Sequence, residues 1–362
     1  MNRYFILVAL LLSFMPATAV SQADDAPGNP APTDNGPVSP LELPHDKSID
    51  AIALTPDGKM VATTTFESKD GKGSSTVRLW SLPDGKIQKM WSGGQGLINR
   101  LVFSPDGQIL AASNNGTLAL WNLQGQRQKT WVGHKRDVES LVFSPDGKTL
   151  VSGSLRPYEH NLCGELFLWD VATGRKREIL MEEAGGATSV AFSSDGTQLV
   201  SPQSQFVVGI WDVQTLELKR VIGQGDTTIR GVVTAVAFSA DGRFVATGDS
   251  GHGLKVWDAH IGQLQAVLLH IKDNWNGTGP SGSVEGVAFG ADGGTLISGG
   301  SNQEGFGGEA ELLVWNWPKK QITFSLLRPP SEGVRRLVIS ADGKTFATTG
   351  TFSSTVKVWH LP

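Results

Sequence analysis

The sequence predicts an all-β protein in which one structural unit is repeated seven times, and two regular features of the chain carry this prediction. An Asp-Gly pair recurs at intervals of 40 to 51 residues, and apolar residues alternate along the stretch before each pair, as in "LVFSPDG". Such period-two alternation running into Asp-Gly is typical of a strand that enters a tight hairpin turn. A tryptophan then ends a short β-rich run in every unit, as in "TVKVW".

The landmarks of the seven units keep a common register. The aspartates of the Asp-Gly pairs are Asp57, Asp106, Asp146, Asp195, Asp241, Asp292 and Asp342. The tryptophans are Trp80, Trp121, Trp169, Trp211, Trp257, Trp315 and Trp359. Six residues after the aspartate stands a hydroxyl residue in every unit but the second, which has Ala112; these residues are Thr63, Ser152, Ser201, Thr247, Ser298 and Thr348. A unit of four short strands with these landmarks resembles the WD-repeat family of β-propellers.

The resemblance covers about residues 41–362 and implies a seven-bladed β-propeller of four-stranded blades. In that family a His before the first strand, a Ser or Thr on the second and the Trp on the third form a polar network, which an Asp in the turn between the second and third strands completes. Two units carry the His in this register: His45 with Thr63 and Trp80, and His134 with Ser152 and Trp169. The other five units have no His there, so we expect a ring held mainly by apolar packing between blades.

The C-terminal end of the sequence predicts how the ring closes. The chain stops just after the third strand of the seventh unit, which leaves that blade one strand short. Residues 41–43, which precede the first unit, are free to supply the fourth strand. We therefore expect the N-terminal strand to complete the last blade and to remove an exposed sheet edge.

The first forty residues differ in composition from the repeats. Residues 5–15 are apolar apart from Ser13, follow Arg3, and precede small residues that offer cleavage after Ala19 or Ala23. This pattern predicts a secretory signal peptide over residues 1–23, because the apolar run is shorter than the roughly 20 residues that span a bilayer. An uncleaved N-terminal anchor is the alternative. Residues 24–40 are rich in Pro, Asp, Asn and Gly and predict a flexible spacer. The expected location is periplasmic or extracellular.

Charge and cysteine content narrow the classes of partner. The chain has 31 Lys and Arg against 35 Asp and Glu, a net charge of −4, and no long basic run, which argues against a nucleic-acid ligand. Cys163 is the only cysteine, so no disulfide within the chain is expected. We expect Cys163 to be a free thiol, with an intermolecular bridge as the alternative, and we favour a monomer.

The spacing of the landmarks predicts which face of the ring binds. Units one, three and six carry about eight extra residues between the aspartate and the tryptophan, and the links after units four and five are also long. Turns between second and third strands and links between blades share one face, here called the insertion face; the opposite face, with the Asp-Gly turns, is the Asp-Gly face. Insertions gathered on one face of a repeat protein are often its binding surface. Its aromatic, Arg and His side chains are the predicted contact residues, Phe66, Arg156, Tyr158, His160, Arg230, Trp275 and Phe306.

The sequence contains none of the common catalytic signatures. A nucleophile elbow, a Walker loop and an H-E-x-x-H motif are absent, and the seven His residues are scattered. No catalytic residue, metal ion or cofactor is therefore expected. The sequence predicts a non-catalytic exported scaffold that binds a protein or peptide through the insertion face. An enzyme or a small-molecule or glycan binder with an axial pocket is the alternative, which carboxylates and His at the central opening of the insertion face would favour.

Overall fold

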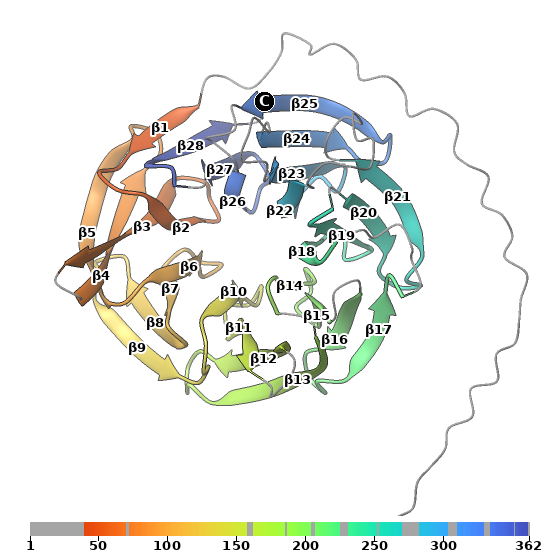
Figure 1. Ribbon diagram of the computed structural model, residues 1–362, viewed down its shortest axis with the longest axis horizontal. Helices are drawn as coiled ribbons and strands as arrows, with labels where there is room; N and C mark the ends of the chain where they lie inside the picture. The colour runs from red at the N-terminus through yellow and green to blue at the C-terminus, as the bar shows by residue number, and fades with distance from the viewer. Residues whose placement is uncertain are drawn as a thin grey trace, which may run out of the picture.

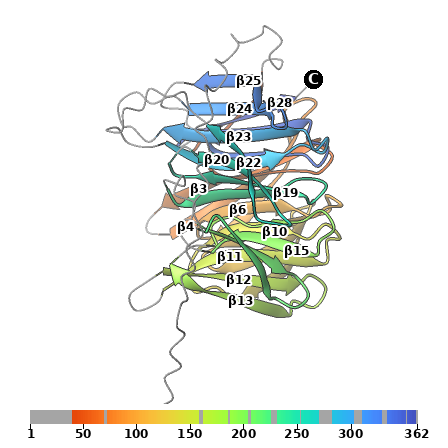
Figure 2. The same ribbon diagram turned by 90° about the vertical axis from the view of Figure 1, so that its right-hand side faces the viewer.

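The computed structural model describes residues 40–69, 72–157, 162–184, 187–203, 207–224, 231–251, 253–269, 282–302, 310–328, 334–350 and 352–360. Every regular element among them is a β-strand, and the strands form seven four-stranded sheets. The sheets are arranged as blades around a central opening (Figure 1). Seen edge-on in Figure 2, the strands run between the two faces of the ring.

Each of the first four blades uses four consecutive strands. Blade 1 contains β2 (Ile49–Leu54), β3 (Met60–Lys69), β4 (Lys72–Ser81) and β5 (Lys86–Gln95). Blade 2 contains β6 (Ile98–Phe103), β7 (Ile109–Asn114), β8 (Thr117–Asn122) and β9 (Arg127–Val132). Blade 3 contains β10 (Val138–Phe143), β11 (Thr149–Pro157), β12 (Leu162–Asp170) and β13 (Lys176–Ala184). Blade 4 contains β14 (Ala191–Phe192), β15 (Gln198–Pro202), β16 (Val208–Asp212) and β17 (Leu218–Ile222).

The remaining blades follow the same plan until the last. Blade 5 contains β18 (Val233–Phe238), β19 (Phe244–Asp249), β20 (Gly253–Asp258) and β21 (Leu264–Leu269). Blade 6 contains β22 (Gly282–Phe289), β23 (Thr295–Asn302), β24 (Ala310–Asn316) and β25 (Gln321–Arg328). Blade 7 contains β26 (Val334–Ile339), β27 (Thr345–Gly350), β28 (Thr355–His360) and, as its outer strand, β1 (Leu41–Pro44).

The N-terminal strand β1 closes the ring, which confirms the closure expected from the sequence. β1 pairs antiparallel with β28, with Leu41 opposite Val358 and Pro44 opposite Thr355. Leu43 is fully buried and packs in one core cluster with Val356 and Val358. The last blade therefore has no unpaired edge at β28, and the two ends of the fold are joined by backbone hydrogen bonds and apolar contact.

Apolar packing between neighbouring blades forms the core. The alternating residues of each strand point to the two faces of its sheet, and each face meets the next blade. In one such cluster Ala62 and Val77 of blade 1 pack against Leu110 and Trp121 of blade 2. Seven clusters of this kind lie between successive blades around the ring. Burial of this apolar surface, at about 25 cal/mol per Å², is the main force that holds the blades together.

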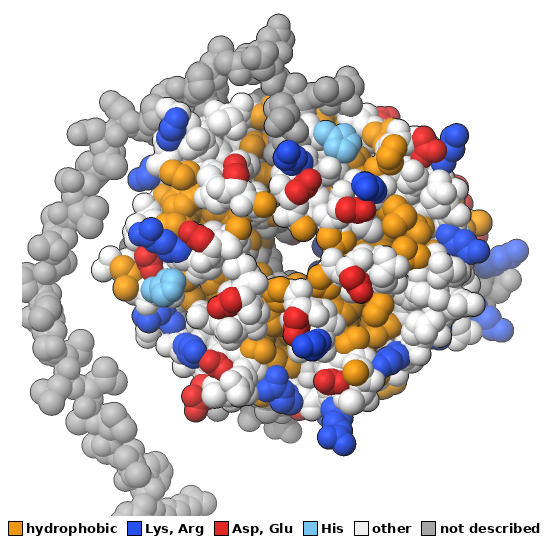
Figure 3. Space-filling view, turned by 180° about the vertical axis from the view of Figure 1, so that it is seen from behind, with side chains coloured by type: hydrophobic (Ala, Val, Ile, Leu, Met, Phe, Trp, Pro, Cys, Tyr) orange, Lys and Arg blue, Asp and Glu red, His pale blue; other side chains and the backbone are white. Residues whose placement is uncertain are grey.

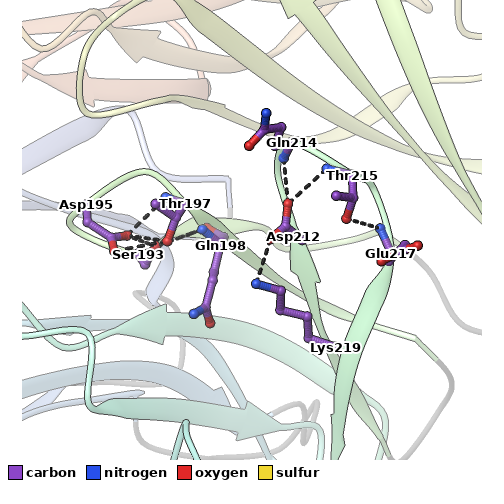
Figure 4. Close-up of polar contacts among 9 residues, drawn as sticks. All are labelled: Ser193, Asp195, Thr197, Gln198, Asp212, Gln214, Thr215, Glu217 and Lys219. Atoms are coloured by element: carbon purple, nitrogen blue, oxygen red, sulfur yellow. Dashed lines mark hydrogen bonds and ion pairs between the residues drawn. The ribbon is translucent and has the colours of Figure 1, made fainter.

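The Asp-Gly pairs form the tight turns between the first and second strands. In blade 4, Asp195 Oδ1 accepts hydrogen bonds from Ser193 Oγ (2.6 Å) and Thr197 N (3.0 Å), while Ser193 Oγ accepts one from Gln198 N at 3.0 Å (Figure 4). Gly196 has a φ of 72°, a left-handed conformation that glycine adopts without steric cost. The hydrogen bond from Ser193 leads the contacts that lower the pKa of Asp195. The carboxylates of the Asp-Gly pairs therefore serve as hydrogen-bond acceptors within their own turns.

A second aspartate in blade 4 organises the turn between the third and fourth strands. Asp212, at the end of β16, accepts hydrogen bonds from Gln214 N (2.8 Å) and Thr215 N (2.9 Å) and forms an ion pair with Lys219 Nζ at 2.6 Å (Figure 4). The hydrogen bond from Lys219, followed by those from the turn, lowers the pKa of Asp212 to about 2. The Trp211-Asp212 dipeptide therefore joins a core tryptophan to a turn-forming carboxylate.

Polar networks inside blades 1 and 3 link the inner strands to the tryptophans. In blade 1, Trp80 Nε1 donates to Thr63 Oγ1 (3.0 Å), which also contacts His45 Nε2 at 2.8 Å. His45 Nδ1 lies 3.0 Å from the carbonyl oxygen of Leu43, which can only accept. His45 therefore carries its proton on Nδ1, and its Nε2 accepts the Thr63 hydroxyl proton.

Blade 3 repeats this arrangement with one more partner. Trp169 Nε1 donates to Ser152 Oγ (2.8 Å), Ser152 Oγ lies 2.6 Å from His134 Nε2, and His134 Nδ1 lies 2.8 Å from Glu165 Oε1. All four side chains are buried. Each polar atom along this chain has a partner, so the network stabilises the blade without leaving a buried group unsatisfied.

The other blades keep only part of the network. The tryptophan donates to the hydroxyl residue in blades 5, 6 and 7, through the pairs Trp257–Thr247, Trp315–Ser298 and Trp359–Thr348. In blade 4 the hydroxyl of Ser201 donates instead to the carbonyl of Ser189, and the buried Trp211 Nε1 has no hydrogen-bond partner among the described residues. Blade 2 has Ala112 at this position, opposite Ala119, and its tryptophan Trp121 lies opposite Leu110.

The stability of the ring is expected to fall in mild acid because of His45. Burial lowers the pKa of His45 from 6.5 to about 4, with Arg78 adding to this effect and the Leu43 carbonyl and Asp46 opposing it. The pKa of His45 in the folded protein lies below its value in the unfolded chain. The contribution of His45 to the unfolding free energy is therefore fully present above pH 6.5 and is lost as the pH falls from 6.5 to about 4. Because the His45 imidazole is partly exposed, the expected loss of unfolding free energy at pH 5 is about 1 to 2 kcal/mol.

Urea unfolding of the wild type and of His45→Gln between pH 7.5 and 5 checks this expectation. The wild type should lose more stability over this range than the variant, because the variant lacks the titrating ring. An identical decline in both proteins would show that other groups cause the acid sensitivity.

Candidate functional site

The extra residues of blades 1 and 3 form longer strands, whereas the sequence suggested loop insertions. β3 and β4 stay paired as far as Lys69 opposite Lys72, and β11 and β12 as far as Pro157 opposite Leu162. Blade 2, in contrast, turns directly at Asn115-Gly116, with Asn114 opposite Thr117. The two arms of each insert are equal in length, so their backbone N–H and C=O groups can pair without interruption. Two hairpins therefore rise above the insertion face.

The structure describes only part of the predicted contact set. Phe66 lies on β3 at the base of the blade 1 hairpin, half-buried, with its ring directly over Gly73. Arg156 lies on β11 opposite Cys163, and the side chains of both are outside the described part of the structure. Tyr158, His160, Arg230, Trp275 and Phe306 lie outside the described residues. Within the described set, Phe66 is thus the one predicted contact residue whose side chain can be placed.

An axial cavity of about 650 Å³ opens at the centre of the ring. Its lining comes from the first residues of the innermost strands, including Ala51 on β2, Arg100 on β6, Glu139 on β10, Thr234 on β18, Glu285 on β22 and Arg336 on β26. These strands start at the inter-blade links and end at the Asp-Gly turns, so the cavity lies toward the insertion face. Figure 3 shows the opposite, Asp-Gly face of the ring, where acidic and basic side chains are interspersed around the central opening.

One wall of the axial cavity is an ion pair between two blades. Arg100 Nη2 lies 2.9 Å from Glu139 Oε2, and Arg100 also donates to the carbonyl oxygens of Glu139 and Asn99. Burial lowers the pKa of Arg100, while Glu139 opposes this effect. Two of these three donors hold blade 2 against blade 3 and the third binds within blade 2, so Arg100 is a fixed positive charge in the wall.

Arg336 brings a second guanidinium into the same cavity with far fewer partners. Its Nη1 lies 3.5 Å from the carbonyl oxygen of Arg335, and its Nε is buried with no hydrogen-bond partner among the described residues. Burial, with Arg100 and Arg335 nearby, lowers the pKa of Arg336 to about 9. The side chain is still cationic at neutral pH, and Ala51 stands between it and Arg100 in the order of the blades. A buried cation without a matched anion favours an oxygen-bearing ligand.

The acidic groups near Arg336 compensate it only in part. Glu285 lines the cavity and raises the pKa of Arg336, but it forms no ion pair within 4 Å among the described residues. Burial raises the pKa of Asp50, with Arg335 and Arg336 acting against the shift. Asp50 Oδ2 is buried without a hydrogen-bond partner in the same described part. The axial opening thus combines arginines and carboxylates, and no His is among the described residues that line it.

Sequence reasoning missed these axial residues and one exposed aromatic side chain. Phe352, in the turn between β27 and β28 on the insertion face, is 83% exposed and has a φ of 59°. The sequence does distinguish the two axial arginines. Arg100 and Arg336 stand six residues before an Asp-Gly aspartate, where the other units have Ala, Ser or Gly. Comparing the seven units at that position would have singled out both arginines.

Comparison with known families decides which propeller this is. The family model described as "WD domain, G-beta repeat" matches residues 85–122, 125–170, 221–258 and 321–360. The chain belongs to the WD-repeat β-propeller family. The first of these WD repeats starts with β5 of blade 1 and ends with β8 of blade 2, and the second and fourth are offset from their blades in the same way. This offset is the reason that a WD-repeat ring needs a strand from outside the last repeat to close it.

Two curated relatives share short segments with this WD-repeat protein. The WD repeat-containing protein slr1409 of Synechocystis sp. is 38% identical over 76 residues, 21% of either chain. The small ribosomal subunit protein RACK1y of rice, Oryza sativa subsp. japonica, is 32% identical over 80 residues, 22% of this chain and 21% of the relative. The matched region spans about a fifth of each relative. WD-repeat propellers are commonly scaffolds for protein interaction, and neither match indicates an enzyme family.

The described residues of the WD-repeat ring contain neither a metal-ligand cluster nor a membrane-spanning helix. No group of three or more His, Cys, Asp or Glu side chains in that part gathers as metal ligands do. No helix there has the length and apolar character needed to cross a membrane. The axial cavity, the raised hairpins and Phe352 are features of the described structure that point to binding.

Proposed function

We propose that this protein is an exported, non-catalytic scaffold that binds a protein or peptide partner across the insertion face. The observation that carries the proposal is the partly unmatched Arg336, set in a cavity that opens on the same face as the raised hairpins and Phe352. Arg and aromatic side chains dominate the binding energy of protein interfaces. An acidic side chain of the partner, inserted at the axis, would supply the oxygen atoms that Arg336 lacks.

Export is supported by the charged start, short apolar run and small-residue cleavage region of residues 1–23, which lie outside the described residues. Cleavage there would release a chain that begins with the spacer and leads directly into β1. The scaffold would then act in the periplasm or outside the cell.

A capture experiment with matched variants tests the function. The full-length gene is expressed with a C-terminal tag, and the purified protein is used to capture partners from the envelope fraction of its own cells. Changing Phe352→Ser with Arg336→Gln should weaken capture by about 10-fold or more, because Phe352 is exposed on the insertion face and Arg336 lines the axial cavity. The control changes Ile261→Ser with Lys59→Gln, one exposed apolar and one charged residue on the Asp-Gly face, and should capture as the wild type does.

The outcomes separate the parts of the proposal. Equal capture by both double variants would exclude the insertion face as the binding surface. N-terminal sequencing of the same purified protein should begin at residue 20 or 24; an intact Met1 in a cytosolic fraction would exclude export. Failure of the folded wild type to capture any partner would favour the second candidate, a small-molecule binder that uses the axial cavity, for which the convergence of Arg100, Arg336 and Glu285 is the favouring observation.

A further inference from the structure

A second cavity, of about 730 Å³, lies between blades 1 and 2. Its buried floor includes Ala112 and Trp121, and its exposed rim includes Lys72, Asn115 and Arg127. The blade 1 hairpin rises beside it, whereas blade 2 turns back early at Asn115-Gly116. The difference in height between two adjacent hairpins leaves the cavity open at the insertion face.

The cavity occupies the place of the polar network that blades 1 and 3 contain. In the common register, Gly94 stands twelve residues before Asp106 and so takes the position of His45 and His134. Ala112 takes the position of the hydroxyl residue, and Trp121 is the tryptophan. All three residues line the cavity. The space that an imidazole and a hydroxyl fill in blades 1 and 3 is therefore open in blade 2.

The loss of these groups leaves the indole of Trp121 without its usual acceptor. Trp80 and Trp169 donate to a Thr or Ser oxygen, whereas Trp121 makes no hydrogen bond to any residue that the structure describes. Arg127 lies close by, with its Cζ 5.8 Å from the Trp121 ring centroid. A Cβ on Gly94 would come within 3.2 Å of Arg127 Nη2, so this guanidinium lies beside the position that His takes elsewhere.

The wall opposite Trp121 is held in a fixed shape. Ser75 Oγ donates to the carbonyl oxygen of Gly96 (2.8 Å) and accepts from Ile98 N (3.0 Å), and Gly96 N donates to the carbonyl oxygen of Gly73 at 3.0 Å. These bonds tie the glycine-rich end of β5 to β4 and to the first residue of β6. The cavity is thus formed before any ligand enters, which lowers the ordering cost of binding.

The lining indicates the chemistry of the ligand. Among the described residues it contains the cations Lys72 and Arg127 but neither Asp nor Glu, and Arg127 forms no ion pair with any of them. Amide and hydroxyl groups of Asn114, Asn115, Thr117 and Thr130 supply further hydrogen-bonding positions. Such a lining favours an anion that also carries hydroxyl groups, because each of these groups can then pair on burial.

We propose that this cavity binds a polyhydroxylated carboxylate about the size of a sugar acid. A ligand oxygen accepts the hydrogen bond of the Trp121 indole, where blades 1 and 3 use their own Thr or Ser. The carboxylate pairs with the Arg127 guanidinium beside Gly94, and the remaining hydroxyl groups meet the amide and hydroxyl side chains of the rim. This site is separate from the axial cavity and is independent of the partner proposed for the insertion face.

Titration calorimetry with the full mature chain tests the ligand class with three probes. Glucuronate carries both the carboxylate and the hydroxyl groups, glucose lacks the carboxylate, and acetate lacks the hydroxyl groups. Saturable binding of glucuronate at least about 10-fold tighter than that of either other probe is expected, because a charge-assisted hydrogen bond is worth a factor of this order. Equal affinity for glucose and glucuronate, or no saturable binding of glucuronate, would overturn the proposal.

Two variants test the place of binding. Ala112→Ser restores the hydroxyl of blade 3, so it should raise the thermal midpoint and weaken glucuronate binding by about 10-fold or more. Arg127→Gln should weaken binding to a similar extent without a change in fold. The matched control is Arg175→Gln, which removes the same charge from an exposed residue on the Asp-Gly face and should bind as the wild type does. Unchanged affinity in both cavity variants would show that glucuronate binds elsewhere.

The indole proton of Trp121 provides a readout that does not depend on variant stability. In a nitrogen-15 spectrum of the wild type, the Trp121 indole signal is identified by its loss in Trp121→Phe. Glucuronate should shift this signal and leave those of the network tryptophans Trp80 and Trp169 in place. A Trp121 signal that stays unmoved at saturating glucuronate would overturn the assignment of the indole as the donor.

Discussion

Removal of β1 is expected to cost the folded ring at least about 3 kcal/mol of unfolding free energy. A chain that starts at His45 loses the backbone pairing from Leu41 opposite Val358 to Pro44 opposite Thr355 and the burial of Leu43 among Val356 and Val358. It also exposes β28 as an unpaired edge, which promotes association with a second copy. Denaturant unfolding and light scattering after gel filtration measure both effects.

The control for this experiment starts at Pro40 and keeps β1 whole. It should unfold at the same denaturant concentration as the longer chain, because it keeps all of β1 and its pairing with β28. The point variant Leu43→Asp separates apolar burial from strand pairing and should be destabilised in the same direction. If the chain that starts at His45 is as stable and monomeric as the one that starts at Pro40, β1 does not close the ring in solution.

Changing Ser152→Ala is expected to destabilise the protein by about 2 to 5 kcal/mol. The variant leaves His134 Nε2 without a donor and Trp169 Nε1 without an acceptor, and both rings are buried. Each buried polar group that loses its partner costs about 1 to 3 kcal/mol. Urea unfolding monitored by tryptophan fluorescence gives the change directly.

Ser201→Ala is the matched comparison, since Ser201 holds the same register position in blade 4 and is as deeply buried. Its hydroxyl donates to the carbonyl oxygen of Ser189 and does not contact Trp211 through a hydrogen bond. We expect a loss of about 1 kcal/mol. Equal losses in the two variants would mean that the His134–Ser152–Trp169 network contributes nothing beyond one ordinary hydrogen bond.

The fold was open to prediction because its landmarks are local. Each Asp-Gly turn sets the register of the strands on both sides of it, and a one-residue slip would turn every core side chain to the wrong face. Counting strands along the chain likewise showed that the last blade lacks a fourth strand, and β1 supplies it. Seven repeats of one hairpin pattern leave few alternatives to a closed ring.

The site was less open to prediction because it depends on which side chains meet across blades. Arg100 and Arg336 are 236 residues apart in the sequence and come together only because blades 2 and 7 flank blade 1. The eight extra residues of blade 1 read as a loop because of "KDGKGSS", yet both arms pair as strands. The register did show Gly94 and Ala112 as departures, but not that they leave a cavity in front of Trp121.

The pairing of β1 with β28 also sets the order in which the molecule can be finished. A ribosome makes β1 before all other strands of the fold and β28 after all of them, so the first strand has no partner until synthesis is nearly over. Six blades can form while the chain is still growing, but the seventh cannot. Closing so long a loop adds only a modest entropic cost, which grows with the logarithm of its length. The cost in time is larger, because contacts between distant segments slow folding. Until β28 pairs with β1, the nascent protein is an open arc of blades, and both of its ends can associate with other chains.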